Sequence, residues 1–352
     1  MNTKLVLLVA ALFLLVQCKT NEQKNSLNES DSVANADKEL QVKAQSFFKV
    51  IPAIALNDNI KSSEAMVKLG KLLYFDTRLS KQQTQSCNSC HNLATYGVDN
   101  LATSPGDNKT MGTRNSPSVF NAALHKVQFW DGRAANVEEQ AVMPITNPIE
   151  MGMSNDKEVV KRISGVEGYK KLFAEAFADE KAPITYKNIG IAIGAFERTL
   201  LTSDRFDKYL NGDMAAITDS EKKGLHTFIN TGCITCHTGT ALGGELLMKF
   251  GLHTDYAPLT GSKMVDNGKF DVTKNEADKY VFKSQSLRNI EKTHPYFHDG
   301  SIADLKTAIQ IMAKTELGKE LSSEETESIH TFLLALTGEI APDKITAPEM
   351  LK

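Results

Sequence analysis

Apolar side chains recur at helical spacing through most of this chain. The pattern is clearest in four segments, at residues 62–73, 186–201, 219–229 and 322–336. In the first segment, Ser62 and Ser63 precede Met66, Leu69 and Leu72, as expected for a capped amphipathic helix. No long alternation of apolar and polar residues indicates a β-strand. The pattern predicts a mainly α-helical protein.

The N-terminus has the pattern of an export signal. Lys4 precedes an apolar run from Leu5 to Val16, which is too short to span a bilayer. The run ends at Gln17-Cys18, which resembles a lipoprotein processing site except for the large Gln17. Residues 1–18 are therefore predicted to be a signal peptide, either with lipidation of Cys18 or with plain cleavage. Residues 19–45 are polar and are predicted to form a flexible tether.

The chain contains the motif Cys-x-x-Cys-His twice. One copy is Cys87, Cys90 and His91, and the other is Cys233, Cys236 and His237. This motif is typical of covalently attached c-type haem, in which the thiols bind the porphyrin vinyl groups and the histidine binds iron. Two Cys pairs could also build one zinc site or act as redox thiols, but neither alternative requires the histidine. The motifs predict two haem c groups.

Composition limits the remaining possibilities. Five cysteines are two haem pairs plus Cys18, so none is left for a disulfide bond. The net charge of −3 gives no indication of nucleic-acid binding, and a length of 352 residues allows two domains. Phe129-Trp130-Asp131-Gly132 resembles Phe297-His298-Asp299-Gly300, and each follows a haem motif. This second repeat indicates a tandem duplication of a small helical cytochrome c unit.

We therefore predict two tandem cytochrome c-like domains, each with one covalent haem. The first covers residues 46–204, the second covers residues 205–338, and residues 339–352 form a C-terminal tail.

The two halves differ in the groups that can approach the iron. Met312 follows the second motif at a spacing suited to an axial ligand, and Met143 takes nearly the same place in the first half. Two Met-ligated haems would make an electron carrier, and packing in the core is the commoner role of methionine. In the first half, Gln140 and Glu150 flank Pro144, which predicts a rigid loop that presents an amide and a carboxylate.

These residues resemble the bacterial di-haem cytochrome c peroxidases. The resemblance extends over most of the chain after the tether. It rests on the two haem motifs and on the runs at residues 114–121, 128–134, 139–140, 148–151, 296–300 and 333–338.

The resemblance implies a role for each candidate residue. His91 would hold a peroxidatic haem with Gln140 and Glu150 on its distal side. His237 and Met312 would hold a second haem that collects electrons, and Trp130 would couple the two haems. Calcium would lie between the domains at Asn115, Thr293 and Pro295, whose oxygens suit that cation. Arg133 and Arg288 are candidate partners of haem propionates, or members of ordinary ion pairs.

The resemblance also implies the reaction and its partners. Hydrogen peroxide would be reduced to water with electrons from a small cytochrome c or cupredoxin in the periplasm. The enzyme would be a homodimer that touches the membrane only through a lipid anchor. Many members of the family carry a histidine that blocks the peroxidatic iron, but Asp107 stands at that place here. We therefore expect an open first iron, although His125 or Met143 could still approach it.

Two other functions remain open at this point. One is a di-haem electron-transfer cytochrome without peroxide turnover. The other is an oxidase of a partner protein of the methylamine-utilisation type, which has Tyr where this chain has Met312.

Overall fold

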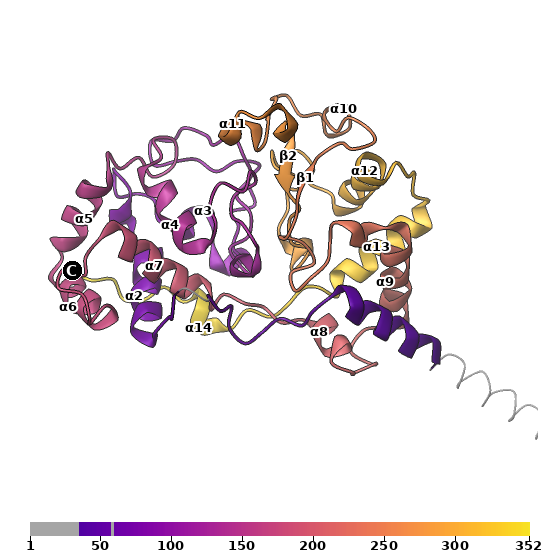
Figure 1. Ribbon diagram of the computed structural model, residues 1–352, viewed down its shortest axis with the longest axis horizontal. Helices are drawn as coiled ribbons and strands as arrows, with labels where there is room; N and C mark the ends of the chain where they lie inside the picture. Colours follow the sequence, from indigo (N-terminus) through magenta and orange to yellow (C-terminus); the bar gives the residue numbers. More distant parts are fainter. Residues whose placement is uncertain (1–34, 58–59) are drawn as a thin grey trace, which may run out of the picture.

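The computed structural model describes residues 35–57 and 60–352, which form two helical halves that lie next to each other (Figure 1). The longer helices of the first half are α2 (Glu64–Phe75), α4 (Val137–Thr146), α5 (Asp156–Ser164), α6 (Glu167–Ala176) and α7 (Tyr186–Glu197). Those of the second half are α8 (Arg205–Leu210), α9 (Asp219–Thr231), α12 (Leu305–Leu317) and α13 (Ser323–Leu334). Four-residue helices are α3 (Cys87–Cys90), α10 (Ala257–Thr260), α11 (Phe270–Thr273) and α14 (Pro342–Ile345). The predicted mainly α fold is confirmed.

The only sheet in the described residues is a short two-stranded sheet in the second half. Strands β1 (Leu247–Lys249) and β2 (Val281–Lys283) are antiparallel, with Met248 opposite Phe282. No helix in the described part of the chain is long and apolar enough to cross a membrane. The predicted signal peptide with Cys18 lies outside the described residues.

The predicted helices begin at polar caps. The Ser63 side chain accepts a hydrogen bond from the backbone N–H of Met66 at the start of α2. Ser322 and Glu325 cap α13 reciprocally, and Thr218 and Glu221 do the same for α9. These caps satisfy backbone N–H groups that have no partner within the helix. Local sequence is therefore sufficient to start these helices.

In each half, two long helices pack closely and enclose a core. In the first half α2 packs on α7, and a Cβ atom at Gly70 would lie 1.8 Å from the carbonyl oxygen of Ala192. In the second half α9 packs on α13, and a Cβ atom at Gly224 would lie 2.0 Å from the carbonyl oxygen of Ser328. Leu200 belongs to the first core and Phe206 to the second, so the halves meet between these residues.

The prediction that residues 19–45 form a flexible tether is wrong for residues 35–45. A helix runs through residues 35–47, and Ala44 and Phe48 are buried in the core of the second half. The Gln41 Nε2 atom donates to the carbonyl oxygen of Tyr209 at 2.6 Å. Few apolar residues mark this helix in the sequence, because it contributes only one narrow face to a core built by distant residues.

The C-terminal tail leaves the second half and packs against the first half. Residues Ile340, Ile345 and Leu351 pack against the core of the first half. The Arg78 Nη2 atom donates to the carbonyl oxygen of Leu351 at 3.0 Å. In Figure 1 the yellow end of the chain reaches α6, while the indigo helix lies against the second half. The C-terminal end of the chain therefore completes the core of the first half, and the helix at residues 35–47 completes the core of the second half.

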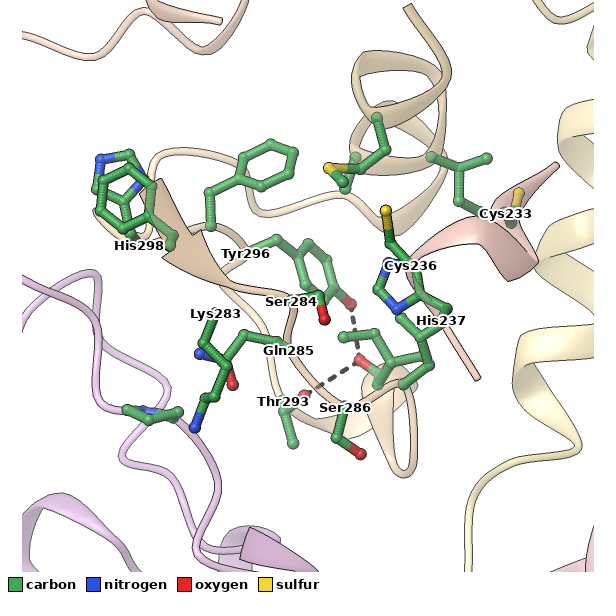
Figure 2. Close-up of a pocket in the computed structure, with 18 of the residues that line it drawn as sticks. Cys233, Cys236, His237, Lys283, Ser284, Gln285, Ser286, Thr293, Tyr296 and His298 are labelled. Atoms are coloured by element: carbon green, nitrogen blue, oxygen red, sulfur yellow. Dashed lines mark hydrogen bonds between the residues drawn. The ribbon is translucent and has the colours of Figure 1, made fainter. Parts of the chain in front are cut away.

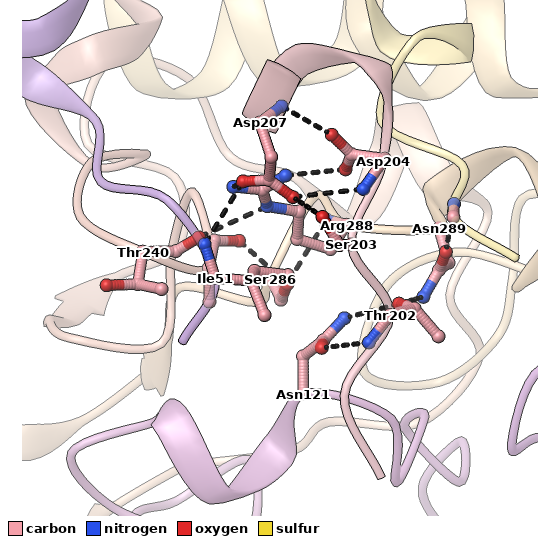
Figure 3. A network of polar contacts seen from close by, with 12 residues as sticks. Ile51, Asn121, Thr202, Ser203, Asp204, Asp207, Thr240, Ser286, Arg288 and Asn289 are labelled. Atoms are coloured by element: carbon pink, nitrogen blue, oxygen red, sulfur yellow. Dashed lines mark hydrogen bonds and ion pairs between the residues drawn. The ribbon is translucent and has the colours of Figure 1, made fainter. Parts of the chain in front are cut away.

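A buried hydrogen-bond network joins the halves at the crossover (Figure 3). The Thr202 hydroxyl accepts hydrogen bonds from Asn121 Nδ2 at 3.0 Å and from Asn289 Nδ2 at 2.8 Å. Both asparagines have positive φ angles, of 61° and 62°. They occupy matching places in the two halves, because each directly precedes a 3₁₀ turn. One threonine therefore connects the two copies of a repeated element.

The second sequence repeat is also a structural repeat. Phe129 and Phe297 have φ angles of 64° and 72°, and the backbone pairs Gln128 with Ala134 and Tyr296 with Ile302 in the same way. Trp130 and His298 therefore take equivalent positions in two copies of one turn. The two rings contact each other edge to face, with centroids 6.3 Å apart.

Candidate functional site

Two cavities gather the candidate residues. The first is lined by Cys87, Cys90, His91, Gln140 and Glu150. The second is lined by Cys233, Cys236, His237 and Met312, and Figure 2 shows its labelled residues. Each haem motif thus lies on a cavity of its own.

The first motif forms the one-turn helix α3. This geometry brings Cys87 and Cys90 one turn apart, and the backbone N–H of His91 donates to the carbonyl oxygen of Cys87 at 3.0 Å. The His91 Nδ1 atom lies 2.9 Å from the carbonyl oxygen of Pro117. A carbonyl only accepts, so Nδ1 carries the proton and Nε2 keeps its lone pair for a metal. Burial lowers the pKa of His91, which also favours the neutral ligand form.

The second motif repeats this arrangement. The His237 backbone N–H donates to the carbonyl oxygen of Cys233 at 3.0 Å. Its Nδ1 atom lies 3.1 Å from the carbonyl oxygen of Leu242, which again leaves Nε2 free. Burial lowers the pKa of this histidine as well. Both histidines are therefore held as neutral imidazoles with a fixed tautomer.

The alternatives to haem are not supported by the geometry. No group of three or more His, Cys, Asp or Glu side chains in the described residues could hold a metal ion, so the two Cys pairs do not build one zinc site. None of the four motif cysteines forms a disulfide bond. Burial raises the pKa of Cys90 to about 11 and of Cys233 to about 12, whereas a redox thiol requires a lowered pKa.

The residues in both cavities fit a covalently attached haem. Each cavity offers two thiols one turn apart and one imidazole with a free Nε2 atom. The second also offers the thioether sulfur of Met312 on α12. Sulfur and imidazole nitrogen are the usual ligands of iron in c-type cytochromes.

Helix α4 presents the polar groups of the first cavity. The predicted helix break is wrong, because α4 continues through Pro144 to Thr146. Proline removes one N–H group, but it lies in the last turn, where the helix is about to end. Gln140 lies inside α4 and Glu150 lies in the turn after it, and both line the cavity. Burial raises the pKa of Glu150, although nearby Arg133 opposes the shift.

Met143 does not line the first cavity and is 36% exposed. Met143 is therefore not placed as a ligand of the first iron, and Met151, which does line this cavity, belongs to the core of the first half. Met312, in contrast, lines the second cavity. The two cavities thus differ in whether the methionine expected as an axial ligand lines them.

Asp107 is turned away from the first cavity. Its carboxylate accepts hydrogen bonds from the hydroxyl groups of Ser80 at 2.9 Å and Thr84 at 2.7 Å and from the backbone N–H of Gln82 at 2.5 Å. These bonds lower its pKa and fix the loop in which it lies. The backbone N–H of Asp107 also donates to the carbonyl oxygen of Glu150 at 2.7 Å. The residue at the place of the expected histidine is therefore an anchor of the loop.

Trp130 lies in the wall between the cavities and lines both of them. Its Nε1 atom donates to the carbonyl oxygen of Asn115 at 2.9 Å, which fixes the indole ring. His125, Lys283 and His298 also line both cavities. The wall thus combines the indole ring with titratable side chains.

The three residues that were expected to bind calcium lie at the border of the second cavity. Asn115, Thr293 and Pro295 all line it, and Asn115 comes from the first half while the others come from the second. The Asn115 Nδ2 atom donates to the carbonyl oxygen of Leu101 at 2.9 Å, so its Oδ1 atom is the group available to a cation.

The two arginines expected at the propionates differ in their surroundings. Arg133 lines the first cavity and lies over the Phe129 ring, 3.4 Å from its centroid. Arg288 is fully occupied by protein groups, because it pairs with Asp204 at 2.5 Å and Asp207 at 2.8 Å (Figure 3). The alternative of an ordinary ion pair is therefore correct for Arg288.

A family model described as "Di-haem cytochrome c peroxidase" matches residues 64–215. The chain is 42% identical over 316 residues to a cytochrome c551 peroxidase of Pseudomonas aeruginosa, covering 89% of this chain and 90% of that protein. The chain belongs to the di-haem cytochrome c peroxidase family. A cytochrome c551 peroxidase of Nitrosomonas europaea is 43% identical over 275 residues, or 78% of this chain and 80% of that protein. The family resemblance is confirmed, and with it the expectation of two haem c groups.

A solved structure of a "MauG-like protein associated with microbial copper homeostasis" superposes with a TM-score of 0.75. It is 30% identical and covers 85% of this chain and 97% of that protein. The two-domain fold is therefore shared with solved members of this group of di-haem proteins.

Sequence reasoning missed two cavity residues. Glu197 lies at the end of α7 and lines the first cavity, but Glu197-Arg198 in a sequence reads as a solvated ion pair. Lys283 lies in β2 and is only 3% exposed. Nothing in its sequence neighbourhood distinguishes it from a surface lysine, because its burial depends on contacts with residues far away in the chain.

Proposed function

We propose that this peroxidase reduces hydrogen peroxide to water at the first cavity and collects electrons at the second. The observation that carries the proposal is the inequality of the cavities. The first presents the Glu150 carboxyl and the Gln140 amide, while the second presents the Met312 thioether. A methionine cap favours electron transfer, and an open iron next to an acid favours chemistry on a bound oxidant.

Glu150 moves the proton in this proposal. None of the hydrogen bonds among the described residues engages its side chain, so the carboxylate is available to a ligand in the cavity. Its raised pKa makes it a stronger base than an exposed glutamate. Glu150 takes the proton of one peroxide oxygen and returns it to the departing oxygen. Gln140 orients the peroxide and stabilises developing charge.

When bound, the haems would supply the site of peroxide binding and would pass on the two electrons that the donor provides, which reduction to water consumes together with two protons. Cys87, Cys90 and His91 would hold the first haem, and Cys233, Cys236, His237 and Met312 would hold the second. Trp130 would lie between the haems and provide the aromatic contact through which they exchange electrons. Its position in the wall of both cavities supports this role.

Several accessory features belong to the same proposal. Asn115, Thr293 and Pro295 bind calcium where the halves meet. The protein acts in the periplasm, anchored through Cys18, as a homodimer. A small cytochrome c or cupredoxin is its electron donor. The family and the export signal support these features.

We further propose that the first iron has no protein ligand on its distal side, even in the oxidised enzyme. Asp107 is held in the loop by Ser80, Gln82 and Thr84, and Met143 lies outside the cavity. His125 does line the cavity, but its Nδ1 atom contacts Lys283 Nζ at 3.2 Å. The as-isolated ferric protein should therefore show a high-spin haem signal in EPR and turn over peroxide without prior reduction. A wholly low-spin spectrum would contradict an open first iron.

The deciding experiment compares Glu150→Gln with the parent enzyme and with Glu139→Gln. Glu139 is exposed on α4 and accepts a hydrogen bond from the backbone N–H of Ala135, so it serves as a matched control. Peroxide turnover with a reduced small cytochrome c should fall by about 10²- to 10⁴-fold in Glu150→Gln. The control should retain parental turnover. Equal turnover in all three proteins would rule out a proton-transfer role for Glu150.

A further inference from the structure

A buried lysine without an ion-pair partner among the described residues lies between the two cavities. The Lys283 side chain is 3% exposed, and its Nζ atom contacts the carbonyl oxygen of Val127 and His125 Nδ1, each at 3.2 Å. No carboxylate in the described residues forms an ion pair with this ammonium group. The Asp131 carboxylate attracts this group from a distance, but it forms its ion pairs with Arg114 and Arg133.

Such a group is costly unless a ligand compensates for it. An isolated ammonium in the protein interior loses hydration that two neutral contacts do not replace. Burial lowers the pKa of Lys283 to about 7, although Asp131 opposes the shift. An anion next to this group would restore the charged form.

Three neighbouring side chains also have donors without acceptors. Because the Lys283 ammonium only donates, His125 Nδ1 accepts from it, and His125 Nε2 carries the other proton. That Nε2 atom, the Ser284 hydroxyl and the Gln285 Nε2 atom are buried without hydrogen-bond partners. Buried donors are almost always satisfied in folded proteins. Three of the unsatisfied buried polar atoms thus lie on residues 284–285 next to Lys283 and on His125, which contacts it; the others are on His298, Ser301 and His330.

The position of this donor cluster matches one part of a c-type haem. A covalently attached haem extends its two propionates from the edge opposite its thioether links. Lys283 and Gln285 lie across the second cavity from Cys233 and Cys236 (Figure 2). Ser284 and Gln285 line only the second cavity, whereas Lys283 and His125 line both. Arg288, the expected partner, is occupied by Asp204 and Asp207.

We propose that Lys283, His125, Ser284 and Gln285 form a cradle for a propionate of the second haem. Lys283 is the counter-ion, and the other three side chains donate hydrogen bonds to the same carboxylate. The backbone N–H of Lys283 donates to the carbonyl oxygen of Trp130 at 2.7 Å. The propionate charge is thus neutralised directly beside the ring that lies between the haems.

This inference rests on the proposed attachment of two haems, but not on peroxide turnover. It predicts the reduction potential of the second haem. An uncompensated propionate stabilises the ferric form, so Lys283→Met should lower the midpoint potential of that haem. Lys283→Arg keeps the charge and should remain near the parental value. Gln285→Leu removes one neutral donor and should cause a smaller shift in the same direction.

The test is a spectroelectrochemical titration of the intact protein. Haem content is measured first, and the propionate bending bands are recorded by resonance Raman spectroscopy. The control is Lys223→Met, because Lys223 is exposed on α9 and pairs with Glu324 at 2.6 Å. A lower potential and altered propionate bands in Lys283→Met, but not in the control, are expected. Parental potentials and bands in Lys283→Met with full haem content would overturn the cradle.

The proposed function and the propionate cradle can be contradicted independently of each other. A parent protein with two haems and no peroxide turnover would contradict the proposed function, while the shift in potential would still support the cradle. Normal turnover with unchanged potentials in Lys283→Met and Gln285→Leu would contradict only the cradle.

Discussion

The Glu197 carboxyl group is a second acid in the first cavity, separate from Glu150. It is 5% exposed, and burial together with nearby Glu138 raises its pKa to about 8, while Arg198 opposes the shift. Arg198 cannot compensate fully, because its guanidinium is paired with Glu138 through Nε at 2.6 Å and Nη2 at 2.9 Å. Glu197 is therefore a buried carboxyl that holds its proton near neutral pH.

This residue should make stability depend on pH. The folded state keeps the proton up to about pH 8, whereas the unfolded chain releases it near its ordinary value of 4.5. The free energy of unfolding should therefore fall as the pH rises between these values, by up to about 1.4 kcal/mol per pH unit. In Glu197→Gln this part of the slope should disappear.

Urea unfolding of the haem-loaded protein at several pH values measures the slope. Glu175→Gln, at an exposed position on α6, is the control and should keep the parental slope. Identical slopes in Glu197→Gln and the parent would show that Glu197 ionises normally in the folded protein.

At the scale of elements, each half depends on the close approach of two helices. At Gly70 of α2, a Cβ atom would lie 1.8 Å from the carbonyl oxygen of Ala192 and 3.0 Å from Phe196 Cβ. Backbone on α7 cannot move aside as a flexible side chain would. The spacing between α2 and α7 therefore depends on the absence of a side chain at Gly70.

Gly70→Ala should destabilise the protein by about 1–3 kcal/mol or more, because helix α7 must shift to accommodate the methyl group. Thermal unfolding of the intact protein checks this expectation. Gly165→Ala is the control, because Gly165 follows α5 with a negative φ and its Cβ atom would come no closer than 3.3 Å to the carbonyl oxygen of Arg162 and 3.6 Å to that of Lys161. A melting temperature that falls no further in Gly70→Ala than in Gly165→Ala would contradict the tight contact.

At the scale of the whole molecule, the halves are joined by crossing chain ends and by a buried polar junction. The hydroxyl of Thr202 accepts from Asn121 and Asn289, and the Asn289 Oδ1 atom accepts from the backbone N–H of Gly338 at 3.0 Å. Both cavities share a wall that crosses this same boundary. The junction therefore helps to fix the position of one cavity relative to the other.

Thr202→Val should lower the free energy of unfolding markedly, although it only replaces a hydroxyl group with a methyl group. Two buried amide groups would lose their acceptor, and each costs about 1–3 kcal/mol when left without a partner. Thr199→Val is the matched control, because the Thr199 hydroxyl only donates to the carbonyl oxygen of Phe196. Urea unfolding of both variants measures the difference. Equal losses of stability would show that Thr202 does not carry the junction.

Local interactions made the helices and haem motifs predictable from sequence. The caps at Ser63 and Ser322 and the apolar spacing after them act within one or two turns. The Cys-x-x-Cys-His motif is equally local, since all of its chemistry lies in five residues. The repeated turns at Phe129 and Phe297 were visible because their strained backbone is encoded by the same short sequence twice.

Contacts between distant segments were not predictable in this way. The helix at residues 35–47 was expected to be part of a tether, because the core that it covers is supplied by Phe206 and other residues far along the chain. Pro144 was expected to end a helix, but its place in the last turn of α4 removes most of the cost. Both errors concern elements whose stability comes from their tertiary surroundings.

The sequence by itself determined the cofactor class, the family and the main helices, because these depend on residue types at short spacing. Only the tertiary structure decided which groups face each cavity. It turned Asp107 and Arg288 into structural anchors and brought the unpaired Lys283 ammonium between the two cavities. Burial and the pairing of charges arise when distant segments meet, so no local pattern could have revealed them.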